Sequence, residues 1–210
     1  NGYTPEDNKK TLALAKKFLL VKVALGLHPS ETWRMSPADV TTVLAAVARQ
    51  KPVAIGEVGL DGTYKNMEKQ VTAFKRFITL ARKKHLPLIV HSRKAEPLVV
   101  DTLEKEGAKK VILHCFTGKL NLALRAEKLG WSFSIPPIIV HSTHFQELVK
   151  RISLTRLLTE TDAPYLSPVK GERNEPRNIR IVVEKIAELK GITVKEAEQA
   201  IYMNYQNLFS

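Results

Sequence analysis

The stretch from residue 88 to residue 114 begins with Leu-Ile-Val-His and ends with Val-Ile-Leu-His. A helical pattern over 97–103 separates the two apolar runs, and Gly107 stands where such a helix would stop. Short apolar runs bounded by breakers are typical of strands buried on both faces, as a parallel sheet requires. The stretch therefore predicts two parallel strands that are joined by a helix and end in His91 and His114.

The same unit recurs on both sides of this stretch. Apolar runs also end at His28, Glu57 and Asp162, and a weaker, alternating run covers 131–135. Helical patterns lie between or after these runs, at 67–81, 177–190 and 193–208. Alternating strands and helices predict parallel strands joined by right-handed crossovers. Because no linker-like tract divides the chain, we expect residues 1–210 to form a single domain.

Two architectures fit this alternation, an open doubly wound sheet and a (β/α)8 barrel. A doubly wound sheet gathers its chemistry at one switch point, whereas a barrel brings every strand end to one mouth. Here polar residues that can bind metal close five strands, and the sequence has no glycine-rich phosphate fingerprint. The pattern therefore favours an α/β fold of the TIM-type (β/α)8 barrel class.

The composition limits the function and the compartment. Hydrophobic residues make up 44% of the 210 residues and charged residues 26%, which excludes wholesale disorder and a fibrous repeat. The single Cys115 cannot form an internal disulfide, so we expect a reducing, cytoplasmic location. No apolar run approaches the roughly 20 residues that a membrane span needs, so we expect no membrane partner. The net charge of +12 favours a polyanionic partner such as nucleic acid, although a merely lysine-rich surface gives the same number.

The strand ends themselves predict a metal centre. Histidine and carboxylate ligands together suit ions such as Zn, Mn, Ni or Fe, whereas carboxylates alone would favour Mg. Two ions held by a bridging carboxylate can stabilise both the attacking and the leaving oxygen of a phosphoryl displacement. Any one of these side chains could be a hydrogen-bonded core residue, but the set at equivalent positions points to metal: His28, Glu57, His91, His114 and Asp162.

Six motifs occur in order along the chain: Gly-Leu-His-Pro at 26–29, Gly-Glu-Val-Gly-Leu-Asp at 56–61, His-Ser-Arg at 91–93, His-Cys-Phe-Thr-Gly at 114–118, Glu-Thr-Asp-Ala-Pro-Tyr-Leu at 160–166 and Asn-Glu-Pro at 174–176. From about residue 20 onward, the chain closely resembles the TatD family of metal-dependent hydrolases and deoxyribonucleases. The resemblance implies an amidohydrolase-type barrel that holds one or two divalent ions.

The resemblance also implies a role for each matching residue. Glu57 would bridge the two ions, and His91 and His114 would complete one of them. Asp162 would bind the other ion and serve as the general base, because a carboxylate there can touch both the metal and the attacking water. The motifs place His28 and Arg93 near the mouth, where we expect them to bind substrate phosphate. Glu160 is expected to support a ligand rather than to bind metal itself.

One departure from the family pattern concerns the first strand. The family begins with an Asp-x-His-x-His motif, which this sequence lacks, and His141 and His144 do not match it. Only about six strands are visible, whereas a closed barrel has eight. We therefore expect that one or two β/α units, roughly 30 to 50 residues, precede residue 1 and carry the missing histidines. The open edges of the strands that end in His28 and Asp162 should then be covered by loops or another chain.

The leading functional hypothesis is a divalent-metal-dependent hydrolase that cleaves phosphodiester bonds of DNA as an exonuclease, through a metal-activated water. The alternatives are a metal-dependent deacylase or amidase, for example on aminoacyl-tRNA, and an inactive relative that only binds nucleic acid. The sequence leaves open whether the ion is Mg, Mn or Zn, whether the substrate is DNA or RNA, and the oligomeric state.

Overall fold

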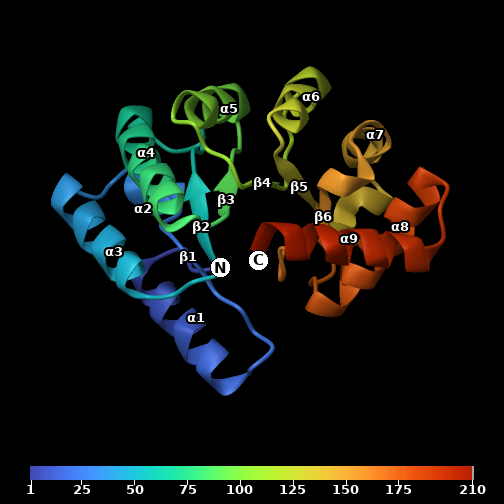
Figure 1. The fold of residues 1–210 in the computed structure, drawn as a ribbon, viewed down its shortest axis with the longest axis horizontal. Coiled ribbons are helices and arrows are strands. Elements are labelled where there is room, and N and C mark those ends of the chain that lie inside the picture. Colours follow the sequence, from blue (N-terminus) through green and yellow to red (C-terminus); the bar gives the residue numbers. More distant parts are fainter. Residues whose placement is uncertain (210) are drawn as a thin grey trace. The chain divides into compact units, whose positions relative to one another are not determined.

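A computed structural model describes residues 1–209, which form two compact units (Figure 1). The first unit comprises residues 1–113 and Phe209, and the second comprises residues 114–208. That these units make up a single domain stays a prediction.

The first unit consists of parallel strands that neighbour one another in chain order, with helices between them. Ala24 pairs with Ala54, and Leu88 pairs with both Ile55 and Val111. The elements are α1 (Pro5–Lys17), β1 (Ala24–Leu25), α2 (Pro29–Thr32), α3 (Pro37–Arg49), β2 (Ala54–Gly59), α4 (Met67–Lys84), β3 (Leu88–His91), α5 (Glu96–Lys105) and β4 (Val111–His114). Because the strands are parallel, their carboxyl ends share one edge of the sheet.

Helix α4 shows how the sequence pattern covers this sheet. Its apolar stripe buries Phe74, Phe77 and Ile78, each of which is at most 1% exposed. Basic residues in its last turn, Arg82, Lys83 and Lys84, lie where they complement the helix dipole. The helix predicted for 67–81 is therefore confirmed and extends three residues further.

The second unit contains a parallel strand pair, in which Phe133 pairs with Leu157 and Ile135 with Thr159. Its elements are α6 (Leu120–Lys128), β5 (Ser132–Ile135), the 3-10 helix η1 (Pro137–Val140), α7 (Thr143–Arg151), η2 (Leu154–Arg156), β6 (Leu157–Thr159), η3 (Pro176–Asn178), α8 (Ile179–Lys190) and α9 (Val194–Phe209). The two predicted closing helices correspond to α8 and α9.

Two polar contacts fix the position of α9. Thr193 caps its start, because the Thr193 hydroxyl accepts from the Glu196 backbone N–H while the Glu196 carboxylate accepts from Thr193 N. Further along, Asn204 Nδ2 donates to the carbonyls of Leu154 and Leu157, at 2.8 Å each. The buried Asn204 therefore ties the closing helix to β6.

Residues 1–209 contain six strands, the number predicted from the sequence. Alongside β1, Gly2 N donates to Ala24 O at 3.1 Å and His28 N donates to Tyr3 O at 2.9 Å. Part of the β1 edge is thus covered by residues 2 and 3. That further β/α units precede residue 1 stays a prediction. No helix within residues 1–209 is both long and apolar enough to cross a membrane.

Gly59, at the end of β2, allows β2 to approach β3 closely. Its φ is 147°, and a Cβ at this position would lie 2.0 Å from the His91 carbonyl oxygen. We expect Gly59→Ala to lower the free energy of unfolding by about 3 kcal/mol, because backbone strain and overpacking add. Urea denaturation measures this loss.

The matched control for this prediction is Gly171→Ala. Gly171 also has a positive φ, 85°, but nothing lies within 4 Å of a Cβ there. Gly171→Ala therefore adds backbone strain but no steric clash. Equal stability of the two variants would contradict the close approach of β2 to β3.

Candidate metal centre

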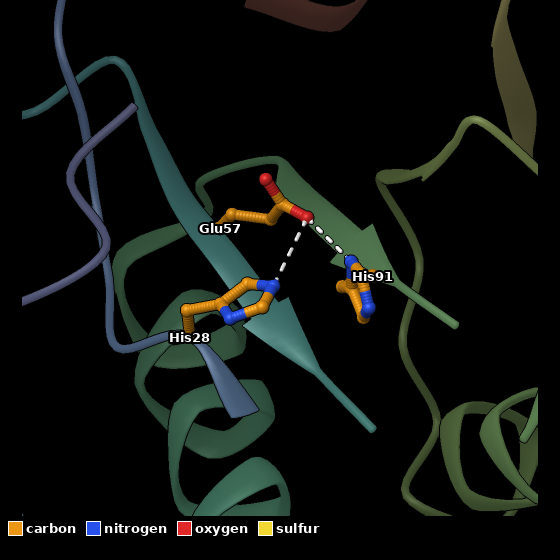
Figure 2. A group of neighbouring side chains, drawn as sticks. All are labelled: His28, Glu57 and His91. Carbon is orange, nitrogen blue, oxygen red and sulfur yellow. Dashed lines mark hydrogen bonds and ion pairs between the residues drawn. The ribbon is translucent and has the colours of Figure 1, made fainter. Parts of the chain in front are cut away.

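Three predicted site residues meet at the carboxyl edge of the first unit (Figure 2). Glu57 lies in β2, His91 ends β3, and His28 follows β1 as the N-cap of α2. Glu57 Oε1 lies 2.8 Å from His91 Nδ1 and 3.8 Å from His28 Nε2. One ligand atom from each of the three residues lies within 4.8 Å of the others. The parallel register of neighbouring strands thus brings together three of the five strand-end residues.

The ring of His28 is oriented by local contacts. Its Nδ1 accepts a hydrogen bond from Ser30 N at 3.1 Å, which turns Nε2 toward Glu57. The rings of Tyr3 and His91 pack edge-to-face against it, with centroids 5.2 Å and 4.4 Å away. The family resemblance implied that His28 binds substrate phosphate, whereas its place at a strand end pointed to metal, and the geometry makes it a candidate metal ligand beside Glu57 and His91.

Asp61 belongs to this cluster, although sequence reasoning gave it no role. Its side chain is buried, and Oδ2 lies 3.0 Å from His91 Nε2. Its Oδ1 accepts from Thr63 N and from the Thr63 hydroxyl, at 2.8 and 2.6 Å. The available signal was its place two residues after the end of β2 and four beyond Glu57, where a buried carboxylate needs a partner.

The Asp61 carboxyl and the His91 ring shift each other's pKa. Burial alone would raise the pKa of the Asp61 carboxyl, but hydrogen bonds from His91 and Thr63 outweigh it and hold that pKa well below its usual range. Burial likewise disfavours the charged form of His91, yet the contacts with Asp61 and Glu57 raise its pKa above the ordinary value. The contact between Asp61 and His91 therefore favours the negative form of Asp61 and the positive form of the His91 ring.

A second cluster lies in the second unit. His114 Nδ1 lies 2.5 Å from Glu160 Oε2, and His114 Nε2 lies 3.7 Å from Asp162 Oδ1. The Ser134 hydroxyl also donates to Glu160 Oε2. Burial raises the pKa of Glu160 despite the opposing effects of His114 and Ser134. Within residues 1–209, the buried Oε1 of Glu160 has no hydrogen-bond partner.

The loop that carries Asp162 is held by a single buried side chain. Asn174, 1% exposed, donates from Nδ2 to the carbonyls of Thr161 and Tyr165, at 2.5 and 2.6 Å. The backbone N of Asn174 donates in turn to Pro164 O at 3.0 Å. The Asn-Glu-Pro motif thus positions this loop.

The donor sets fit a divalent cation. Imidazole nitrogens and carboxylate oxygens are the ligands of Zn and other borderline ions. Glu57 Oε1 faces the imidazole rings of both His28 and His91. Within residues 1–209 the buried Glu160 Oε1 has no hydrogen-bond partner, and a proton, a water or an ion would satisfy it. Within residues 1–209, His28, Glu57 and His91 therefore form a candidate metal site, and His114 and Asp162 carry donor atoms of the same kind.

A family model described as TatD related DNase matches residues 1–210 of the chain. The chain belongs to the TatD family. It is 41% identical over 192 residues to human deoxyribonuclease TATDN3, covering 88% of this chain and 70% of that protein. It is 37% identical to the Bacillus subtilis metal-dependent hydrolase YabD, covering 99% of this chain and 85% of that protein.

Solved structures agree with this TatD assignment. The crystal structure of the TatD homologue YJJV from Escherichia coli superposes with a TM-score of 0.90 at 28% identity, covering 99% of this chain and 84% of that chain. The predicted TIM-type barrel class is thereby confirmed. The chain is a TatD-type metal-dependent hydrolase.

The remaining candidates of this TatD chain lie outside the two clusters. Arg93 is exposed, two residues beyond His91, and its side chain forms no ion pair with any residue in 1–209. His141 Nε2 contacts Pro168 O, and His144 Nε2 contacts Phe116 O at 3.0 Å. Backbone carbonyls thus contact a ring nitrogen of each of these histidines.

Proposed function

We propose that this TatD chain hydrolyses phosphodiester bonds at the ends of DNA, as an exonuclease that depends on a divalent ion. The observation that carries the proposal is the single oxygen of Glu57 that faces ring nitrogens of His28 and His91. The net charge of +12 supports a polyanionic substrate over a neutral one. The name of the human relative, deoxyribonuclease, supports DNA.

In this proposal the first unit offers His28, Glu57 and His91 as metal ligands. The second unit offers His114 and Asp162. A divalent ion held by such ligands lowers the pKa of a bound water and polarises phosphoryl oxygens. Asp162 is partly exposed, at 24% of its side chain, so water can reach its carboxylate. It takes the proton of the attacking water while the water oxygen bonds to phosphorus and the bond to the leaving sugar oxygen breaks.

Arg93 would hold the substrate phosphate. Its planar guanidinium can donate two parallel hydrogen bonds to a phosphate, which an ammonium cannot do. We expect Arg93→Lys to raise the KM for DNA about tenfold, with kcat and Mn²⁺ affinity little changed, because one bidentate contact is worth on the order of 1.5 kcal/mol. Steady-state kinetics and calorimetric metal titration separate the two effects.

The control for this substitution is Arg49→Lys on α3, which makes the same change at an exposed position. If Arg93→Lys weakened metal binding as much as it weakened substrate binding, Arg93 would be supporting the scaffold instead.

Binding to DNA is expected to weaken steeply with salt, because each phosphate contact releases condensed counterions. Fluorescence anisotropy with labelled DNA between 50 and about 200 mM salt should show a fall of at least about tenfold if two or more contacts form. An affinity that stayed flat over this range would indicate a small neutral substrate and favour a deacylase.

The deciding experiment crosses substrates with metals. End-labelled single- and double-stranded DNA, RNA and aminoacyl-tRNA are each incubated with Mg²⁺, Mn²⁺ or Zn²⁺ and with a chelator. The proposal expects progressive shortening of DNA from an end, abolished by the chelator. Release of amino acid from tRNA without DNA cleavage would identify a deacylase, and binding without cleavage of any substrate an inactive relative; either result contradicts the proposal.

A further inference from the structure

We propose that Asp61 and Glu160 are positioning residues that decide which ring nitrogen of a neighbouring histidine faces the metal: Nδ1 in His91 and Nε2 in His114. The inference rests on the metal centre of the proposed function and does not depend on DNA as the substrate.

The first half of the inference concerns His91. Its two ring nitrogens point in different directions and each contacts one carboxylate, Glu57 at Nδ1 and Asp61 at Nε2. A neutral imidazole that gives one lone pair to a metal must keep its proton on the other nitrogen. Because Asp61 accepts at Nε2, it would hold the remaining ring proton there when Nδ1, on the side of Glu57, gives its lone pair to a metal.

Asp61 can perform this task because it is itself fixed. The Thr63 backbone N–H and hydroxyl both donate to Oδ1, which leaves Oδ2 for the ring. The Asp61 backbone N donates to Gln70 Oε1 at 2.9 Å, and Gln70 is fully buried. A buried carboxylate held at both its backbone and its other oxygen has little freedom to leave His91.

In His114 the two ring nitrogens exchange the roles that they have in His91. Glu160 contacts Nδ1, and Nε2 is the nitrogen that faces Asp162. The side-chain hydrogen bonds of Glu160 within residues 1–209 go only to His114 and Ser134, both through Oε2. This carboxylate therefore acts on the His114 ring, whose proton it holds on Nδ1.

A carboxylate behind a metal-bound histidine fixes the tautomer and ring direction and makes the ligand more basic. Asparagine in place of Asp61 reverses this effect. The Thr63 N–H needs an acceptor and keeps the amide oxygen on its side, so the amide NH₂ turns toward His91. An NH₂ that donates to Nε2 favours the proton on Nδ1, the nitrogen that the metal requires.

The direct test is NMR of the full chain with ¹⁵N-labelled histidine, loaded with Zn²⁺. The sequence contains six histidines, so each can be assigned with one substitution. We expect the ring proton on Nε2 in His91 and on Nδ1 in His114, with the opposite nitrogen shifted by Zn²⁺. A proton on Nδ1 of His91 or on Nε2 of His114, or no Zn²⁺-induced shift in either ring, would overturn the inference.

The second test measures metal affinity by calorimetry with Mn²⁺ and no DNA. Asp61→Asn and Glu160→Gln should each weaken Mn²⁺ binding about 10- to 100-fold. Two control variants remove a carboxylate charge from an exposed position, namely Asp101→Asn on α5 and Glu198→Gln on α9. Each control should bind Mn²⁺ within about twofold of the unaltered chain.

The outcomes separate this inference from the proposed function. If Asp61→Asn and Glu160→Gln bind Mn²⁺ more weakly than their controls but the unaltered chain cleaves no DNA, the proposed function fails and the positioning role stands. If DNA is cleaved but Asp61→Asn and Glu160→Gln bind Mn²⁺ as their controls do, the positioning role fails. Absence of Mn²⁺ binding by the unaltered chain would overturn both.

Discussion

Replacing Glu57 with glutamine is expected to reduce hydrolysis by several orders of magnitude while the fold persists. Glu57 is 2% exposed, and its Oε1 is the atom that faces His28 Nε2 and His91 Nδ1. The amide keeps the shape of the side chain but carries no charge to offset that of a cation. Steady-state kinetics and the Mn²⁺ content of the purified variant measure the loss.

The matched control for this substitution is Glu68→Gln, which removes the same charge from an exposed position on α4. It should retain the activity and metal content of the unaltered chain. Activity of Glu57→Gln within a few fold of that control, at equal metal content, would exclude Glu57 from the centre. Thermal unfolding verifies that both variants are folded.

Asp162→Asn is expected to lower kcat about 10²- to 10⁴-fold, the usual contribution of a general base. Asp162 has a φ of 54°, in the left-handed region that asparagine tolerates better than most residues. The substitution should therefore leave the loop in place and remove only the proton acceptor. Single-turnover kinetics at saturating Mn²⁺ isolate the chemical step.

Glu198→Gln, an exposed change on α9, controls for the loss of one negative charge in the same unit. A single-turnover rate for Asp162→Asn that equals the rate of this control would mean that another group accepts the proton.

Strand positions could be predicted from the sequence because apolar runs and breakers encode them locally. The runs before His91 and His114 became β3 and β4, and the parallel register then brought Glu57 beside His91. In a sheet of neighbouring parallel strands, a residue's place at the strand end is enough to predict which edge it occupies.

The orientation of a histidine ring could not be predicted, because it depends on contacts between residues that are far apart in the sequence. His28 faces Glu57 because the Ser30 backbone N–H occupies its other nitrogen. The contact of Asp61 with His91 spans 30 positions, and that of Ser134 with Glu160 spans 26. Spacing and residue type indicate such pairs only after the register is known.

The anchoring of the Asp162 loop by Asn174 has a consequence for how relatives of this chain can diverge. Residues 169–173 are exposed and lie beyond the carbonyls that Asn174 holds. Insertions or exchanges there would alter the surface beside this loop without moving Asp162, the proposed proton acceptor. Relatives can therefore differ in the substrates that they accept at this segment while they keep the same reaction chemistry.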